Sequence, residues 1–153
     1  MYLLLKKSIA KGVLLAVAGL LTLLASGSDV WALERVWVGG TSIDWFNNAN
    51  WNTLSPAAGD TARIPDVNEA GGFFNPTVNN TETIAGLTVE AGGQLSITLN
   101  AGTNRVFTIN GAMSNSGTIN FWPDGASERL DCSGNWTNNG TFNHSSGRVY
   151  FNG

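Results

Sequence analysis

Apolar and polar residues alternate along several short stretches in the second half of the chain. Every second residue is apolar in 95–99, 107–109 and 149–151. A period of two is typical of a β-strand with one buried face. Asn, Gly and Thr dominate the rest of this half, a composition poor for helices and suited to short strands joined by tight turns. The pattern predicts an all-β domain with almost no helix after the first thirty or so residues.

The alternating stretches belong to a repeat with a shift of 23 residues. Residues 111–121 (GAMSNSGTINF) superpose on 134–144 (GNWTNNGTFNH), and the phrase that ends at Gly111 recurs at Gly134 and Gly153. A fixed period in this range indicates stacked coils, and a coil of about 20 residues accommodates three strands and three turns. The repeat therefore predicts a short parallel β-helix, or β-solenoid, with its coils in 77–153.

Stacking in register makes specific predictions for individual residues. Asn115 would lie over Asn138 and Asn120 over Asn143, forming amide ladders. Polar-plus-Gly pairs such as 110–111 and 139–140 mark the corners, where we expect glycine to adopt a left-handed conformation. Leu130 and Cys132 have the spacing of inward strand positions. Cys132 is then a small buried hydrophobe, with intermolecular disulfide pairing as the alternative.

The first thirty-two residues read as a signal peptide. An uncharged stretch from 13 to 25 has the length of a signal h-region, and 30–32 (VWA) offers a cleavage site after Ala32. A cut near 25–27 and an uncleaved membrane-tethering helix are the alternatives. The positive n-region is supplied by Lys6, Lys7 and Lys11. We expect a secreted or cell-surface protein with no membrane contact after cleavage.

Cleavage leaves an acidic domain of about 120 residues. All three lysines lie in the leader, so residues 33–153 keep five arginines against ten Asp and Glu. Without a basic stripe, nucleic-acid binding is not expected. A chain of this length forms one domain.

Residues 37–51 (WVGGTSIDWFNNANW) and 56–64 (PAAGDTARI) resemble the opening segment of bacterial secreted and surface β-helix proteins, including autotransporter passengers and adhesin-like repeat proteins. Residues 134–142 resemble their coils. The resemblance implies a right-handed parallel β-helix, with 33–76 as the N-terminal cap and opening segment. It implies no activity, because such coils occur in adhesins, structural fibres and polysaccharide-active enzymes alike.

The two ends of the predicted solenoid differ. Trp37, Trp45 and Trp51 are expected to cover the first coil, and an exposed platform for sugar rings is the alternative. Nothing that resembles a cap follows 149–153, and an uncapped strand is a template for another chain. We therefore expect end-to-end self-association, or a continuation of the coils beyond Gly153 in a longer protein.

An insertion of four residues in 122–129 interrupts the repeat. Insertions in solenoids project as loops and often form the binding face. The candidate binding residues are Trp122, Asp124, Glu128 and Arg129, and a solvated turn is the alternative. Surface glycans and a second copy of the chain are the expected partners.

Catalytic equipment is scarce in the sequence. Asp124, Glu128 and Asp131 form the only carboxylate cluster and lack the spacing of a calcium loop, while His144 is the only histidine. We expect no metal, no cofactor and no enzyme activity. The leading hypothesis is a non-catalytic structural or adhesin-like module. The alternatives are a carbohydrate-binding module and a fragment of a larger polysaccharide-active β-helix protein.

Overall fold

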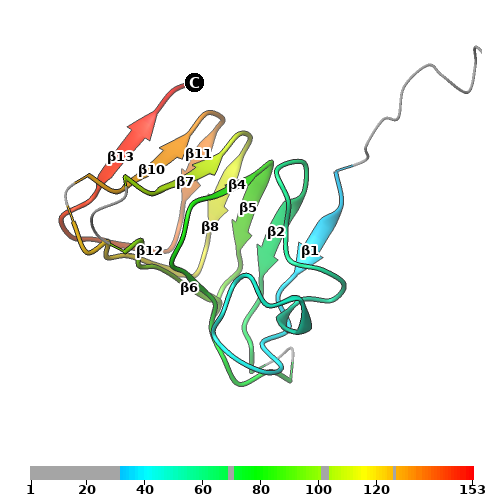
Figure 1. Cartoon of the computed structure of the whole chain (residues 1–153). Coiled ribbons are helices and arrows are strands. Elements are labelled where there is room, and N and C mark those ends of the chain that lie inside the picture. The colour runs from blue at the N-terminus through cyan, green and yellow to red at the C-terminus, as the bar shows by residue number, and fades with distance from the viewer. Residues whose placement is uncertain (1–31, 69–70, 101–103, 126) are drawn as a thin grey trace, which may run out of the picture. The chain divides into compact units, whose positions relative to one another are not determined.

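The computed structural model describes residues 32–68, 71–100, 104–125 and 127–153 (Figure 1). All of the predicted signal peptide except Ala32 lies outside these residues. Within them, no helix has the length and apolar character needed to cross a membrane. Helix in the described part of the chain is confined to one short 3-10 turn, η1 (Asn48–Asn50).

The strands form three sheets (Figure 1). Sheet 1 has the order β1 (Glu34–Val36), β2 (Thr61–Ile64), β5 (Gly86–Val89), β8 (Met113–Asn115) and β11 (Trp136–Asn138). Sheet 2 has the order β3 (Thr77–Val78), β6 (Gln94–Ile97), β9 (Thr118–Phe121) and β12 (Thr141–His144). Sheet 3 has the order β4 (Glu82–Ile84), β7 (Val106–Ile109), β10 (Arg129–Cys132) and β13 (Arg148–Phe151).

The three sheets make a parallel β-solenoid of about four coils, which confirms the predicted fold class. The chain visits sheets 1, 2 and 3 in turn, and all ladders between the named strands are parallel. The predicted register is also confirmed, since Thr118 pairs with Thr141 and Leu130 lies between Phe107 and Val149. Within the predicted opening segment, β1 and β2 already extend sheet 1.

The insertion lies where the repeat placed it. Residues 122–128 join β9 to β10, whereas only 145–147 join β12 to β13 one coil later. All four extra residues are therefore taken up at this one corner, and the strands on either side keep their register.

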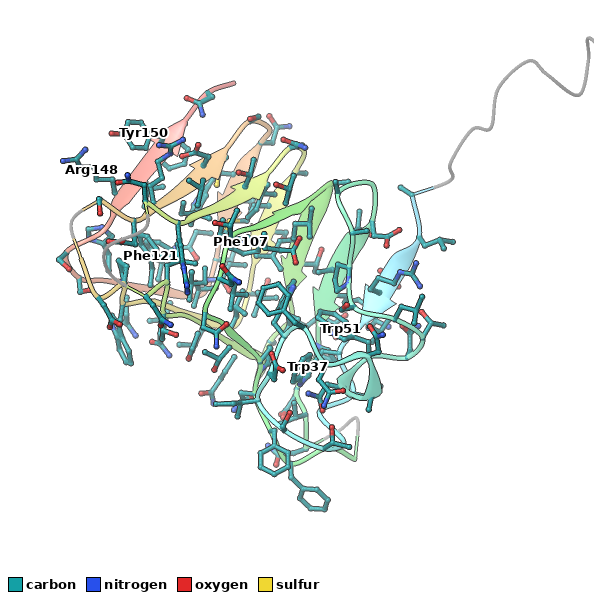
Figure 2. All side chains as sticks on the ribbon, in the orientation of Figure 1. Trp37, Trp51, Phe107, Phe121, Arg148 and Tyr150 are labelled. Carbon is teal, nitrogen blue, oxygen red and sulfur yellow. The ribbon has the colours of Figure 1, made fainter. Side chains whose placement is uncertain are left out.

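The inward side chains of successive coils form one apolar core. Phe107 and Phe121 are fully buried (Figure 2), and so is Leu130. Cys132 is 1% exposed, which confirms its role as a small buried hydrophobe. Burial, together with the nearby charge of Asp131, raises the pKa of its thiol to about 11. The thiol is therefore protonated and unreactive at neutral pH.

Two amide ladders join the last two coils as predicted. Asn115 Nδ2 donates to Asn138 Oδ1 at 2.7 Å and to the Thr141 carbonyl at 3.0 Å. Asn143 Nδ2 donates to Asn120 Oδ1 at 2.8 Å. Asn115 is fully buried, so these bonds satisfy an amide that would otherwise destabilise the core.

The corner glycines are explained by close stacking, and the expected left-handed conformation is wrong for them. Positive φ among glycines of the described residues occurs at Gly39, Gly71 and Gly92, none of which is a predicted repeat corner. A Cβ at Gly117 would lie less than 3.0 Å from the carbonyl oxygens of Gly93 and Glu90. At Gly111, Gly117, Gly134 and Gly140 the backbones of neighbouring coils approach too closely for any side chain, whereas a Cβ at Gly147 would meet the side chains of Pro123 and Phe121.

Three tryptophans pack at the N-terminal end of the solenoid, two of which, Trp37 and Trp51, are labelled in Figure 2. Trp37 and Trp45 are fully buried and Trp51 is 4% exposed. The Trp45 ring lies 4.7 Å from Trp51 and 5.8 Å from Phe107, measured between ring centroids in edge-to-face geometry. A sugar-binding platform built from these three rings is therefore excluded, because their faces are covered by the protein itself.

Candidate functional site: the open last coil

The inner face of the last coil, β11–β13, is exposed where the same positions one coil earlier are buried. Phe151 is 63% exposed, whereas Cys132, its partner in the register, is 1% exposed. Likewise, Trp136 is half-buried whereas its register partner Met113 is buried. Phe142 is half-buried whereas its partner Ile119 is buried. The difference arises because the described residues contain no further coil above β11–β13.

The exposed inward residues form an aromatic cluster. Trp136 lies at the centre, with ring centroids 5.1 Å from Phe142 and 5.3 Å from Phe151, both in edge-to-face geometry. Phe142 also stacks on Phe121 of the coil below at 6.5 Å. Edge-to-face pairs stabilise an arrangement by about 0.5–1.5 kcal/mol each beyond burial. The cluster is therefore held in place before any partner binds.

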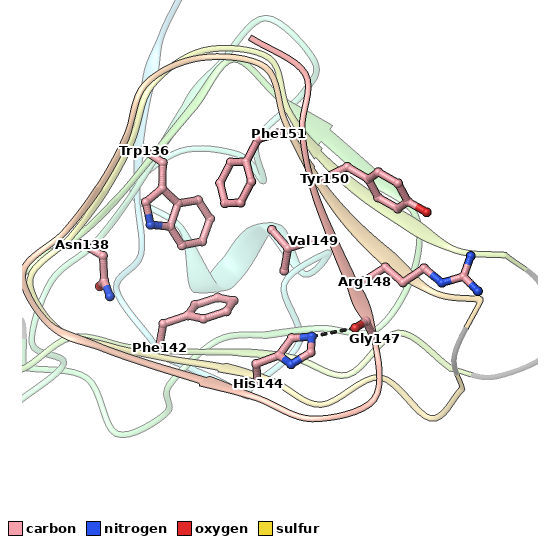
Figure 3. Close-up of a pocket in the computed structure, with 9 residues that line it drawn as sticks. All are labelled: Trp136, Asn138, Phe142, His144, Gly147, Arg148, Val149, Tyr150 and Phe151. Carbon is pink, nitrogen blue, oxygen red and sulfur yellow. Dashed lines mark hydrogen bonds between the residues drawn. The ribbon is translucent and has the colours of Figure 1, made fainter.

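Looking along the coils, these side chains line a triangular hollow (Figure 3). Trp136, Phe142, Val149 and Phe151 point into the triangle, while Tyr150 points away from it. The hollow has a volume of about 610 Å³. Its lining residues are Trp136, Asn138, Phe142, His144, Gly147, Arg148, Val149, Tyr150 and Phe151.

Polar groups are few at the hollow. His144 occupies the register position of Phe121, as the repeat predicted, and its Nε2 lies 2.6 Å from the Gly147 carbonyl oxygen. Arg148 is the only permanently charged lining residue, and its guanidinium points away from the hollow (Figure 3). No carboxylate lines the hollow, and the described residues contain no group of three or more His, Cys, Asp or Glu able to hold a metal ion.

One of the four residues predicted as a binding site is buried, and the other three reach the surface. Trp122 is 49% exposed and Asp124 is exposed, but Glu128 is fully buried. Arg129 points out of sheet 3, where its Nε donates to Asp131 at 2.9 Å and its Cζ lies 5.8 Å from the Tyr150 ring centroid. Glu128 is therefore not part of an exposed surface that includes Trp122 and Asp124.

Glu128 is the unusual member of that set. Ser127 Oγ donates to Glu128 Oε1 at 3.2 Å, while Oε2 has no hydrogen-bond partner among the described residues. The position follows from strand alternation, since 128, 130 and 132 all point inward. Glu128 therefore contributes a buried carboxyl group to the core side of the insertion, where a ligand on the outer surface cannot reach it.

The aromatic cluster of Trp136, Phe142 and Phe151 was not predicted from the sequence. The signal was present in the repeat, because Trp136 aligns with the inward Met113 and Phe142 with the inward Ile119. No further coil covers these positions among the described residues, so aromatic residues there form an apolar hollow.

We compared the chain with known proteins, and no family model, curated protein or solved structure matches it.

Proposed function

We propose that this chain is a non-catalytic structural or adhesin-like module, exported to the cell surface or beyond, that associates with itself through its open last coil. The exposure of Phe151, Trp136 and Phe142 at inward positions carries the proposal. Contiguous apolar patches mark interaction sites, and free strand edges accept further strands. The last coil combines both features.

The chemistry of the hollow supports a binding role over a catalytic one. Cleavage of a glycosidic bond uses paired carboxyl groups, and calcium-dependent chemistry on acidic sugars uses several carboxylate oxygens. The residues lining the hollow are aromatic, aliphatic and amide-bearing, with His144 and Arg148 as the basic groups. Such a surface is suited to packing against another protein.

The N-terminal part of the sequence supports export, and the tryptophan cluster supports a closed first coil. The leader pattern of 1–32 precedes the first strand, β1, by a single residue. We assign Trp37, Trp45 and Trp51 the role of a cap, because their burial against the first coil shields its core from water. A capped first end leaves the last coil as the surface for contacts.

Light scattering of the purified protein tests this function. Phe151→Asp places a charge at a position that is 63% exposed, so the fold should tolerate it while association is lost. The matched control is Phe73→Asp, which changes an 84% exposed phenylalanine before β3. We expect the wild type and Phe73→Asp to associate with rising concentration and Phe151→Asp to stay monomeric. A wild type that is monomeric throughout would overturn the proposal.

Carbohydrate binding is the second candidate, favoured by two exposed aromatic rings. Trp122 is 49% exposed and Tyr150 is 42% exposed, and rings of this kind stack on sugar faces. Titration with glycans should then shift tryptophan fluorescence, and replacing Trp122 and Arg129 by alanine should weaken the response. Unchanged affinity in both variants would remove the 122–129 loop as a sugar site.

A further inference from the structure

We propose that the last coil binds a second copy of this chain tail to tail, about a two-fold axis, with the strands of the copy antiparallel to β11, β12 and β13. The inference rests on the proposed self-association and adds the identity and orientation of the contacting surfaces. A two-fold contact uses the same patch on both copies and closes at the dimer, whereas a head-to-tail contact continues into a filament.

The outer edge of sheet 2 at the N-terminal end is already occupied by the chain itself. Thr77 N in β3 donates to the Ile43 carbonyl at 2.7 Å, and Trp45 N donates to the Thr77 carbonyl at 3.3 Å. Asp44 forms a parallel bridge with Thr77 at the same edge. A coil of another copy could add to β3 only by breaking these hydrogen bonds.

The outer edge of sheet 1 is occupied in the same way. Asn52 N donates to the Val36 carbonyl at 2.9 Å, and Val36 N donates to Asn52 Oδ1 at 3.0 Å. Behind both edges, the interior of the first coil is filled by Trp45, which is fully buried. Head-to-tail stacking would therefore break hydrogen bonds at two of the three sheet edges of this end and meet a filled interior, which favours contact of the last coil with another last coil.

Among the described residues, no strand pairs with the outer edge of β11, β12 or β13. Arg148 N donates to the Glu128 carbonyl and Asn152 N to the Cys132 carbonyl, so these residues face β10. The alternating residues, Val149 and Phe151, turn their N–H and C=O groups to the open edge. These same two residues point their side chains into the hollow, so one contact would satisfy both backbone and side chains.

A two-fold axis perpendicular to the solenoid axis sets one strand of the last coil against the same strand of the copy. Each of the other two strands then lies against the other one's counterpart in the copy. β11 has three residues and is symmetric about Thr137, so self-pairing there sets inward Trp136 opposite inward Asn138 of the copy. β12 and β13 have four residues each and pair with one another. Two registers keep inward residues opposite inward residues. The one that sets Phe142 opposite Phe151 of the copy forms an aromatic cross-strand pair, and it sets Asn143 opposite Tyr150.

Charge does not oppose this contact. Although the whole chain has a formal net charge of −3, no carboxylate lines the hollow and Arg148 points away from it. Two identical ends can therefore meet without like charges buried face to face, which would be costly.

Disulfide trapping tests the orientation. Directly opposed strand residues lie within disulfide reach, and Thr137, Asn143 and Tyr150 are exposed. Under mild oxidation, Thr137→Cys should form a covalent dimer by itself, whereas Asn143→Cys and Tyr150→Cys should cross-link mainly when mixed. The native Cys132 is 1% exposed with a pKa raised to about 11, so it should not compete.

A cysteine near the capped end is the control. Leu54 is 54% exposed beside η1, and Leu54→Cys should not cross-link with itself or with Thr137→Cys. Cross-linking between Leu54→Cys and Thr137→Cys, or particles larger than dimers in light scattering, would overturn the tail-to-tail arrangement while leaving self-association standing. A dimer in which Thr137→Cys fails to cross-link would also overturn it, whereas a monomer at all concentrations would remove the proposed self-association as well.

Discussion

Asn50 is a buried polar residue whose side chain organises the segment between β1 and β2. Its Oδ1 accepts hydrogen bonds from the backbone N–H of Thr41 and of Ser42, both at 3.0 Å, and from Thr41 Oγ1 at 2.7 Å. Its Nδ2 donates to Ser42 Oγ and to the Asp44 carbonyl, both at 2.9 Å. The Asn50 side chain therefore supplies hydrogen bonds to a segment that lies outside the strands of the three sheets.

Removing this amide should destabilise the protein. Asn50→Ala removes a fully buried amide and leaves the N–H groups of Thr41 and Ser42 without this acceptor, which costs about 3 kcal/mol in the free energy of unfolding. Asn139→Ala, at an exposed corner asparagine, should change it by less than about 0.5 kcal/mol. Urea denaturation of the two variants and the wild type measures the difference. Equal midpoints for the two variants would show that the Asn50 bonds do not hold the segment.

Two carboxyl groups of the first coils respond to their surroundings in opposite ways. Burial by itself would raise the pKa of Asp60, but Arg35 Nε at 2.9 Å and the backbone N–H groups of Ala57 and Leu33 hold its pKa below the usual value. Burial raises the pKa of Glu82, which the hydrogen bond from the Thr83 N–H opposes only in part. Asp60 therefore stabilises the fold as an anion, whereas Glu82 is better tolerated when protonated.

Glu82 should make the fold less stable as the pH rises. Because its folded pKa is raised, the folded chain binds this proton more tightly than the unfolded chain. The contribution of Glu82 to the free energy of unfolding is therefore greatest below the usual pKa of 4.5 and falls as pH rises through the folded value. Glu82→Gln should raise the melting temperature at pH 7, and this gain should shrink towards pH 4.

Calorimetry at the two pH values separates this effect from a general gain in stability. Glu34→Gln is the control, because Glu34 lies in β1 with a side chain that is 57% exposed. It should leave the melting temperature nearly unchanged at both pH values. A Glu82→Gln variant that is as stable as the wild type at pH 7 would contradict the linkage.

At the scale of the element, each corner of the solenoid depends on how closely two coils approach. Gly117→Ala should destabilise the fold by about 1–3 kcal/mol, because its Cβ meets carbonyl oxygens that belong to the coil below. Gly59→Ala is the matched control, since a Cβ there has no neighbour within 4 Å and the φ of Gly59 is not positive. It should have no effect or raise stability slightly. Thermal unfolding of both variants measures the contrast, and equal losses would contradict the stacking explanation.

The strands and corners differ in how well the local sequence pattern predicted them. Strand alternation and the shift of 23 residues were sufficient to place Asn115 over Asn138, Leu130 beside Phe107, and the extra residues in 122–129, of which 122–128 form the connection. The same reasoning assigned the wrong cause to the corner glycines. A glycine in a one-dimensional pattern looks the same whether it is required by its own φ or by the backbone of the next coil, and only the stacked coils distinguish the two.

At the scale of the whole molecule, self-association should make thermal stability depend on protein concentration. Binding that occurs only in the folded state stabilises it by about 2.7 kcal/mol when the partner is present at 100 times the dissociation constant. The melting temperature of the wild type should therefore rise with concentration, and that of Phe151→Asp should not. A melting temperature independent of concentration in both proteins would contradict association through the last coil.

The sequence by itself determined the parallel β-solenoid, the register of its last coils and the burial of Cys132, because alternation and a fixed period are repeated locally and stacking copies them into three dimensions. Only the tertiary structure decided the burial of the tryptophans at the first end, the inward position of Glu128 and the hollow above Trp136. Each of these features depends on which segment packs against a given coil. The same sequence pattern buries its inward residues where another coil covers them and exposes them where none does.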